Sequence, residues 1–176
     1  ILVPWLFDWD YLETHDEFNQ TFDVALHLGT LAAVVAYFWK DVVALTSAWV
    51  GSARRRRIET PDERIAWFVA VATVPAAAIG ALGENVIVDR LGEPWQIAFF
   101  LAFFGVLLWV ADKTPPRQEM SDLGLKSAVA VGFAQSLSLM PGVSRSGITI
   151  TAGRFLGLDR DSAARVSFLL LIPITF

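Results

Sequence analysis

Apolar blocks of about 16–20 residues, separated by short charged stretches, constrain this chain more than any other feature. As helices, such blocks match the thickness of a bilayer. Only 18% of the 176 residues are charged and 55% are hydrophobic, whereas soluble domains carry about 25% charged residues. We therefore expect residues 1–176 to form a single all-α, polytopic integral membrane bundle. The expected spans are 22–50, 65–82, 94–111, 125–140 and 162–176.

Residues 141–157 break this pattern. The stretch 147–157 is rich in Gly and Thr and is too short to cross a bilayer, and it follows a Pro-Gly pair. Irregular backbone at membrane depth is tolerated only where protein buries it or where it lines a wet cavity. We therefore predict a re-entrant segment over residues 141–157.

The positive charges are distributed unevenly between the two sides. The loop 51–64 contains five arginines, including the run 54–57, and the loop 112–124 contains Lys113 and Arg117, whereas the opposite segments contain only Arg90. Because Lys and Arg concentrate in cytoplasmic loops, we expect these two loops to be cytoplasmic and the end of span 125–140 to face the extracytoplasmic side. The net charge of −4 argues against a nucleic-acid partner.

Both ends of the sequence lie at unusual places. The chain begins at Ile1 and ends at Phe176 within an apolar run, and we expect it to be an internal piece of a longer protein. It contains no cysteine, so disulfide and thiol chemistry are excluded for these residues.

The run PGVSRSG, residues 141–147, is the strongest candidate for a functional site. An arginine at membrane depth is expensive and usually functional. Arg145 offers a planar fork of donors suited to phosphate, and Ser144 and Ser146 offer hydroxyl groups. Gly142 and Gly147 allow a backbone nest of N–H groups, and Thr149 adds a further hydroxyl. The alternative is a simple turn whose arginine reaches the headgroups.

Several polar residues outside the run are less decisive. A serine nucleophile needs a base, and none lies near Ser144 or Ser146 in sequence. We expect His27 to pack between helices, with a metal or catalytic role as the alternative, and Gln135 either lines a cavity or bonds a neighbouring helix. We expect surface ion pairs among the charged residues Arg154, Asp159, Arg160 and Asp161.

The motif and three other segments together resemble one protein family. Residues 139–149 are similar to the PGxSRSG motif of the undecaprenyl-diphosphate phosphatases (UppP, also called BacA). Further similar segments are residues 22–34, 74–80 and 163–173 (FDVALHLGTLAAV, VPAAAIG and AARVSFLLLIP). The resemblance implies an inverted repeat with two re-entrant segments, of which this chain would contain one half and part of the second.

The resemblance also implies an activity. Members are hydrolases that convert undecaprenyl diphosphate to undecaprenyl phosphate and inorganic phosphate in the bacterial plasma membrane, recycling the lipid carrier of cell-wall synthesis, and their overproduction confers bacitracin resistance. Arg145, Ser144 and Ser146 would then be catalytic, with Gly142, Gly147 and Thr149 binding phosphate. The implied partners are the polyprenyl diphosphate and membrane lipids, with a homodimer as a further possibility.

The resemblance lacks one part of the family pattern. A glutamate-rich E-x-x-x-E stretch and a Ser-Ser-Thr-Gly-His run are expected just before Ile1. Those glutamates would hold Mg²⁺ or Ca²⁺, so we expect no metal ligands in this chain and no activity from these residues alone. The rival reading is a transporter or lipid flippase, because such proteins also contain re-entrant segments.

Overall fold

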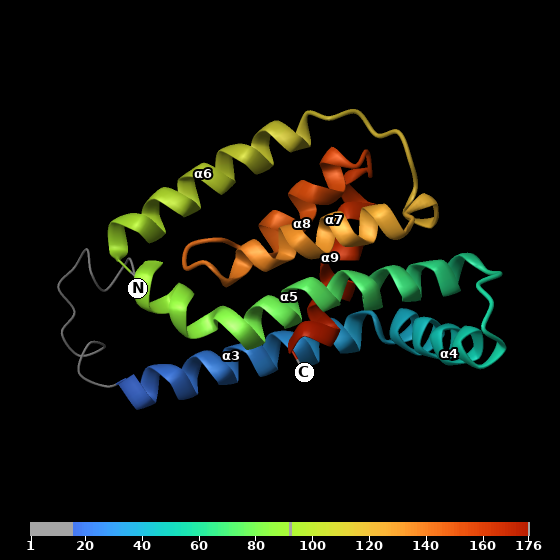
Figure 1. The fold of residues 1–176 in the computed structure, drawn as a ribbon, viewed down its shortest axis with the longest axis horizontal. Coiled ribbons are helices and arrows are strands. Elements are labelled where there is room, and N and C mark those ends of the chain that lie inside the picture. Colours follow the sequence, from blue (N-terminus) through green and yellow to red (C-terminus); the bar gives the residue numbers. More distant parts are fainter. Residues whose placement is uncertain (1–15, 92, 176) are drawn as a thin grey trace.

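Helices account for all the regular structure in residues 16–91 and 93–175, the part that the computed structural model describes. Figure 1 shows their arrangement. The elements are α3 (Asp16–Tyr37), α4 (Trp39–Arg55), α5 (Pro61–Leu91), α6 (Pro94–Asp112), the 3₁₀ turn η1 (Met120–Asp122), α7 (Leu125–Ser136), the 3₁₀ turn η2 (Leu137–Leu139), α8 (Arg145–Phe155) and α9 (Arg160–Thr175).

Two helices in the described ranges are long and apolar enough to cross a bilayer. They are Pro61–Leu82 within α5 and Pro94–Asp112, which is α6, and they coincide with the expected spans 65–82 and 94–111. The 19 residues of α6 extend about 28 Å, close to the hydrocarbon thickness of about 30 Å. The expected all-α membrane bundle is confirmed, and the membrane crossing of α9 stays a prediction.

The prediction of one continuous helix over residues 22–50 is wrong. The helix breaks at Phe38, and the segments Val24–Tyr37 and Trp39–Arg55 meet at 80°. Contacts with α9 hold the break: the Phe38 ring stacks on Phe168 at 6.0 Å, and Arg165 donates to Asp41 at 2.6 Å. α4 is more polar than α3 and runs in a different direction. The pair forms either one broken span or a re-entrant loop.

The buried core lies where α5, α7 and α9 meet. Its members are the side chains of Phe68, Ala72, Leu123, Ala128, Val131, Leu158, Ala163, Val166 and Leu170. The helices α5 and α7 approach very closely, because a Cβ added at Gly132 would lie only 2.6 Å from the Ala72 carbonyl oxygen. This packing fixes α7 within the bundle and so positions the segment that follows it.

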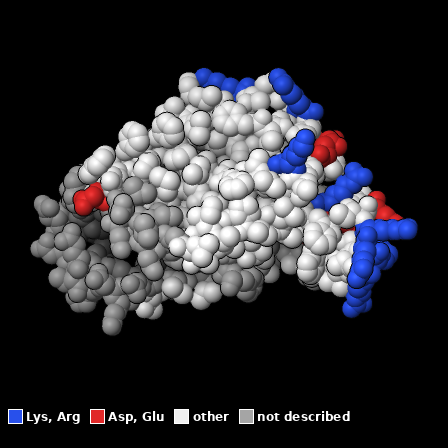
Figure 2. Space-filling model, in the orientation of Figure 1, with Lys and Arg blue, Asp and Glu red and all other residues white. Residues whose placement is uncertain are grey.

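The outer surface combines apolar faces with one basic end. α3 and α6 expose large apolar side chains such as Leu28, Phe99 and Val106, as expected for helices that face lipid. Figure 2 shows Lys and Arg gathered toward one end of the molecule, where α4 leads into α5 and α6 leads into residues 113–124 in Figure 1. The basic loops predicted to be cytoplasmic therefore lie together.

Candidate active site

The PGVSRSG run lies at the tip of a helical hairpin made by α7 and α8. With 12 residues, α7 extends about 18 Å, and α8 with 11 residues returns about 16 Å. After α7 and η2 the chain turns back at residues 140–144 into α8. The span over residues 125–140 and the re-entrant segment over residues 141–157 both stay predictions.

The base of the hairpin is tied to the end of α6. The backbone N–H of Arg117 donates to the Gly157 carbonyl at 2.8 Å, and Arg160 donates to both carboxylate oxygens of Asp112, at 2.7 and 2.6 Å. The end of α8 therefore lies beside the loop that leads into α7. Both ends of the hairpin lie at the basic end of the molecule, and its tip points toward the opposite end, between α5 and α6 (Figure 1).

Arg154 forms a buried clamp at this base. It makes an ion pair, as predicted, with Nε 3.7 Å from Oδ1 of Asp112, but the arginine itself does not lie on the surface. Its side chain is buried, and its guanidinium donates to the carbonyls of Asp112, Thr114 and Leu158, all of which end helices or follow them. Carbonyls at the ends of helices lack donors within the helix, and this arginine supplies them. Arg160 does form the exposed pair with Asp112 that its position suggests.

Gly142 shapes the turn at the tip. Its φ of +92° lies in the region that glycine adopts without steric cost, and a Cβ there would lie 2.5 Å from the Ile97 carbonyl oxygen. Gly142 thus presses the turn against the backbone of α6. Gly147 differs from the nest that we expected, because it lies in the first turn of α8 and its φ is not positive.

Ser144 caps α8 and starts the helix at Arg145. Its backbone is extended, with φ −69° and ψ 122°, and its Oγ accepts from the Gly147 N–H at 3.2 Å. A serine is a favoured residue at this position because it satisfies an N–H at the start of the helix. The structure therefore gives the Ser144 hydroxyl and the Gly147 N–H a capping role in this state.

Arg145 and Ser146 line a cavity of about 370 Å³ between α3, α8 and α9. The other polar side chains in its wall are His27 and Thr30 of α3 and Ser138 of η2. The remaining wall is apolar, including Val143, Phe168 and Leu171. Arg145 brings a guanidinium into this wall, a group whose fork of donors suits an anion such as phosphate.

Thr149 lies behind this cavity. Its side chain is buried, with Oγ1 2.7 Å from Ser167 Oγ of α9 and 2.9 Å from the Arg145 carbonyl oxygen. The hydroxyl thereby joins α8 to α9, and the structure does not bring it to the cavity wall.

The structure places two further polar residues, His27 and Gln135, differently from each other with respect to the cavity. His27, which we expected to pack between helices, lines the cavity with Arg145, and its sequence signal was the polar pair with Thr30 on one face of an apolar helix. Gln135 is buried in α7, and within the described residues neither its Oε1 nor its Nε2 has a hydrogen-bond partner. It does not line the cavity.

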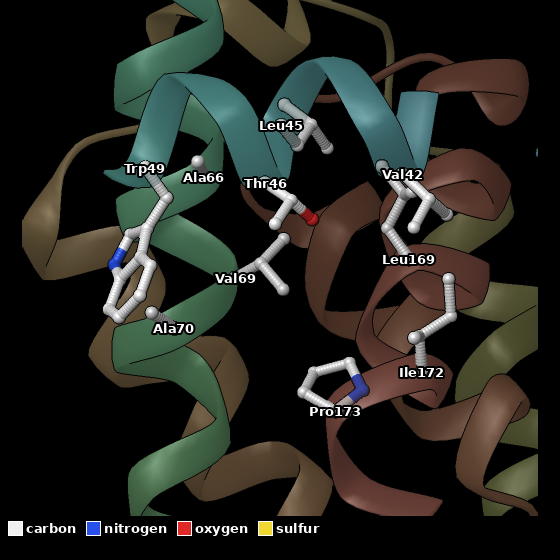
Figure 3. A pocket seen from close by; sticks show the side chains of 10 residues that line it. All are labelled: Val42, Leu45, Thr46, Trp49, Ala66, Val69, Ala70, Leu169, Ile172 and Pro173. Atoms are coloured by element: carbon white, nitrogen blue, oxygen red, sulfur yellow. The ribbon is translucent and has the colours of Figure 1, made fainter. Parts of the chain in front are cut away.

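Another cavity of about 230 Å³ lies between α4, α5 and α9. Figure 3 shows its side chains, which are apolar except for the Thr46 hydroxyl and the indole N–H of Trp49. It offers neither charge nor a nucleophile of useful strength. It therefore offers less for catalysis or anion binding than the cavity that contains Arg145.

The fold defines the chain as an all-α integral membrane protein, with a cavity that contains Arg145 near the tip of a helical hairpin. Comparison with family models matches residues 1–176 to "Bacitracin resistance protein BacA". The chain belongs to this BacA family.

Curated relatives support the assignment. The chain is 45% identical over 175 residues to an undecaprenyl-diphosphatase of Pelotomaculum thermopropionicum, covering 99% of the chain and 62% of the relative. It is 43% identical to the undecaprenyl-diphosphatase of Moorella thermoacetica, covering 99% and 63%. It is 47% identical over 161 residues to that of Rubrobacter xylanophilus, covering 90% and 59%. The chain thus spans about three fifths of the length of these relatives.

Proposed function

We propose that this chain forms part of a membrane phosphatase that hydrolyses undecaprenyl diphosphate to undecaprenyl phosphate and inorganic phosphate. The observation that carries the proposal is the position of Arg145, in the wall of a mostly apolar cavity at the start of α8. The names of the relatives supply the substrate, and the apolar walls suit a lipid that carries a charged head.

The residues of the cavity have distinct proposed tasks. Arg145 holds the terminal phosphate through its fork, and the N-terminus of α8 adds partial positive charge where negative charge builds up in the transition state. Water attacks the terminal phosphorus and gives inorganic phosphate directly, or the Ser146 hydroxyl attacks and water then hydrolyses the resulting phosphoserine. In either route the bond to the bridging oxygen breaks, its electron pair leaves with the prenyl phosphate, and the proton of the nucleophile passes to a phosphate oxygen or to solvent.

The metal predicted from the resemblance enters no step of this proposal. Mg²⁺ and Ca²⁺ prefer carboxylate oxygens, and the described wall of the cavity contains no carboxylate. Among the side chains that the structure describes, those of residues 21–22, 24–82 and 93–174, no cluster of three or more His, Asp or Glu is placed to hold an ion. A requirement for Mg²⁺ or Ca²⁺ remains a proposal about residues outside this wall.

The proposal is tested by phosphate release from undecaprenyl diphosphate in the full-length protein, with added metal and with chelator. Arg145→Lys keeps the charge but loses the fork, so we expect kcat/KM to fall about 10- to 100-fold, as for a lost charge-assisted hydrogen bond of roughly 1.5–3 kcal/mol. Arg160→Lys, at an exposed arginine on the same hairpin base, is the matched control. Turnover by Arg145→Lys equal to the control contradicts the assigned role, and no release by the wild type favours transport.

We further propose that the protein lies in the bacterial plasma membrane with the cavity open to the extracytoplasmic side. The hairpin enters from the basic end, and the length of α7 carries Arg145 past the middle of the bilayer. The chain contains no cysteine, so single-cysteine variants are clean probes. We expect an impermeant reagent added outside to label Ser146→Cys and to spare Arg57→Cys, and the reverse pattern would overturn this orientation.

A further inference from the structure

His27 shares a cavity with the residues of the PGVSRSG run although 118 positions separate it from Arg145. α3 places His27 and Thr30 in one wall, and α8 places Arg145 and Ser146 in another. His27 is exposed, as are its neighbours Leu26 and Leu28, and Leu26 lines the cavity with it.

A histidine in such a helix needs a reason for its position. Ionisable side chains in membrane helices face the bundle interior or a wet cavity, because hydrocarbon cannot solvate them. Thr30, in the same wall, donates its hydroxyl to the Leu26 carbonyl at 2.9 Å within α3. The shared cavity with Arg145 supplies a site at which the imidazole can bind an anion.

We propose that His27 is a further phosphate-binding residue, whose imidazole N–H donates to an oxygen of the terminal phosphate that Arg145 also holds. This inference rests on the proposed phosphatase function and assigns α3 a direct part in it. Arg145 holds the phosphate from one side only, that of α8. A donor on α3 fixes the phosphate from a second helix and so orients the scissile bond against the apolar wall formed by Phe168 and Leu171.

Two substitutions separate binding from packing. His27→Leu keeps much of the volume and removes the donor, whereas His27→Gln keeps an N–H donor on a side chain of similar reach. In the full-length protein with undecaprenyl diphosphate, we expect His27→Leu to lower kcat/KM at least 10-fold and His27→Gln to restore it to within about 3-fold of the wild type. Leu28→Ala, an exposed neighbour on α3, is the control that should leave activity unchanged.

Melting temperature and binding of a non-hydrolysable prenyl methylenediphosphonate complete the experiment. Weakened binding in His27→Leu with an unchanged melting temperature supports the inference. Wild-type activity in His27→Leu overturns it and leaves the phosphatase proposal intact, and so does a loss of activity that follows a lower melting temperature and is not rescued by His27→Gln. A wild-type protein that neither hydrolyses the diphosphate nor binds the diphosphonate overturns both proposals.

Discussion

Replacing Gly142 by alanine tests whether the turn at the hairpin tip is built as the structure has it. The added Cβ meets two costs. The φ of +92° is unfavourable for any residue with a side chain, by about 1–2 kcal/mol. The Cβ would also lie 2.5 Å from the Ile97 carbonyl oxygen and 2.9 Å from the Ile97 Cα, which are backbone atoms and cannot move aside like the end of a side chain.

Displacing α6 or the turn to relieve this overlap costs a further 1–3 kcal/mol, roughly. We therefore expect Gly142→Ala to destabilise the protein by about 2–5 kcal/mol. The seven tryptophans allow melting to be followed by intrinsic fluorescence in detergent micelles. Phosphate release should also fall, because the overlap displaces the turn that leads into Arg145.

Gly105→Ala is the matched control on α6, since a Cβ there has no neighbour within 4 Å and its φ is not positive. Its melting temperature should equal or exceed that of the wild type, because alanine is favoured over glycine inside a helix by roughly 0.5–1 kcal/mol. If Gly142→Ala melts as high as Gly105→Ala and retains full turnover, the turn does not have the described contact with α6.

Four further substitutions test the base of the hairpin, its contact with α9 and the start of α9. Arg154→Met should lower the free energy of unfolding by about 3–5 kcal/mol, because the carbonyls that it clamps lose their donors. Arg160→Met, at an exposed ion pair, should lower it by at most about 1 kcal/mol. The melting temperatures of the two variants give the comparison. Thr149→Val keeps the shape but removes the hydroxyl between α8 and α9, so we expect a loss of about 1–2 kcal/mol in the same assay. Asp159 caps α9, and a backbone N–H donated at 2.6 Å holds the pKa of its carboxyl below the usual range. The ionised carboxyl stabilises the fold above about pH 4, and this effect is lost as the pH falls through the lowered pKa. The melting temperature of the wild type should therefore fall toward that of Asp159→Asn in acid. A difference in melting temperature that stays constant at all pH values contradicts this.

Hydropathy alone identified the two helices in the described ranges that are long and apolar enough to cross a bilayer. The blocks at 65–82 and 94–111 are long runs of apolar residues, and exposure to hydrocarbon demands such runs. The hairpin was harder to recognise because α7 is also apolar, and composition does not say where a buried helix turns back. A signal was present in the polar residues Gln135, Ser136 and Ser138, which lie at the end of the block.

The motif itself was recognisable, but the assignment of its members was not. Thr149 is one helical turn beyond Arg145, so sequence proximity suggested a phosphate contact, whereas the packing of α8 on α9 buries its hydroxyl. His27 reaches the cavity only because α3 lies beside α8 and α9. Arg154 lies close to charged residues in sequence, and only the proximity of α6 turns it into a buried clamp. Each of these outcomes depends on contacts between distant segments, which local patterns do not contain.

The short hairpin has a consequence for the order in which the membrane protein is assembled. Its irregular backbone between η2 and α8 must be shielded from lipid, and the Ile97 backbone of α6 provides part of that shield. α5 and α6 precede the hairpin in the chain and are long enough to insert as spans by themselves. α5 and α6 are therefore synthesised before the hairpin that packs against them. Insertion of the hairpin is then a late step that depends on spans already in place.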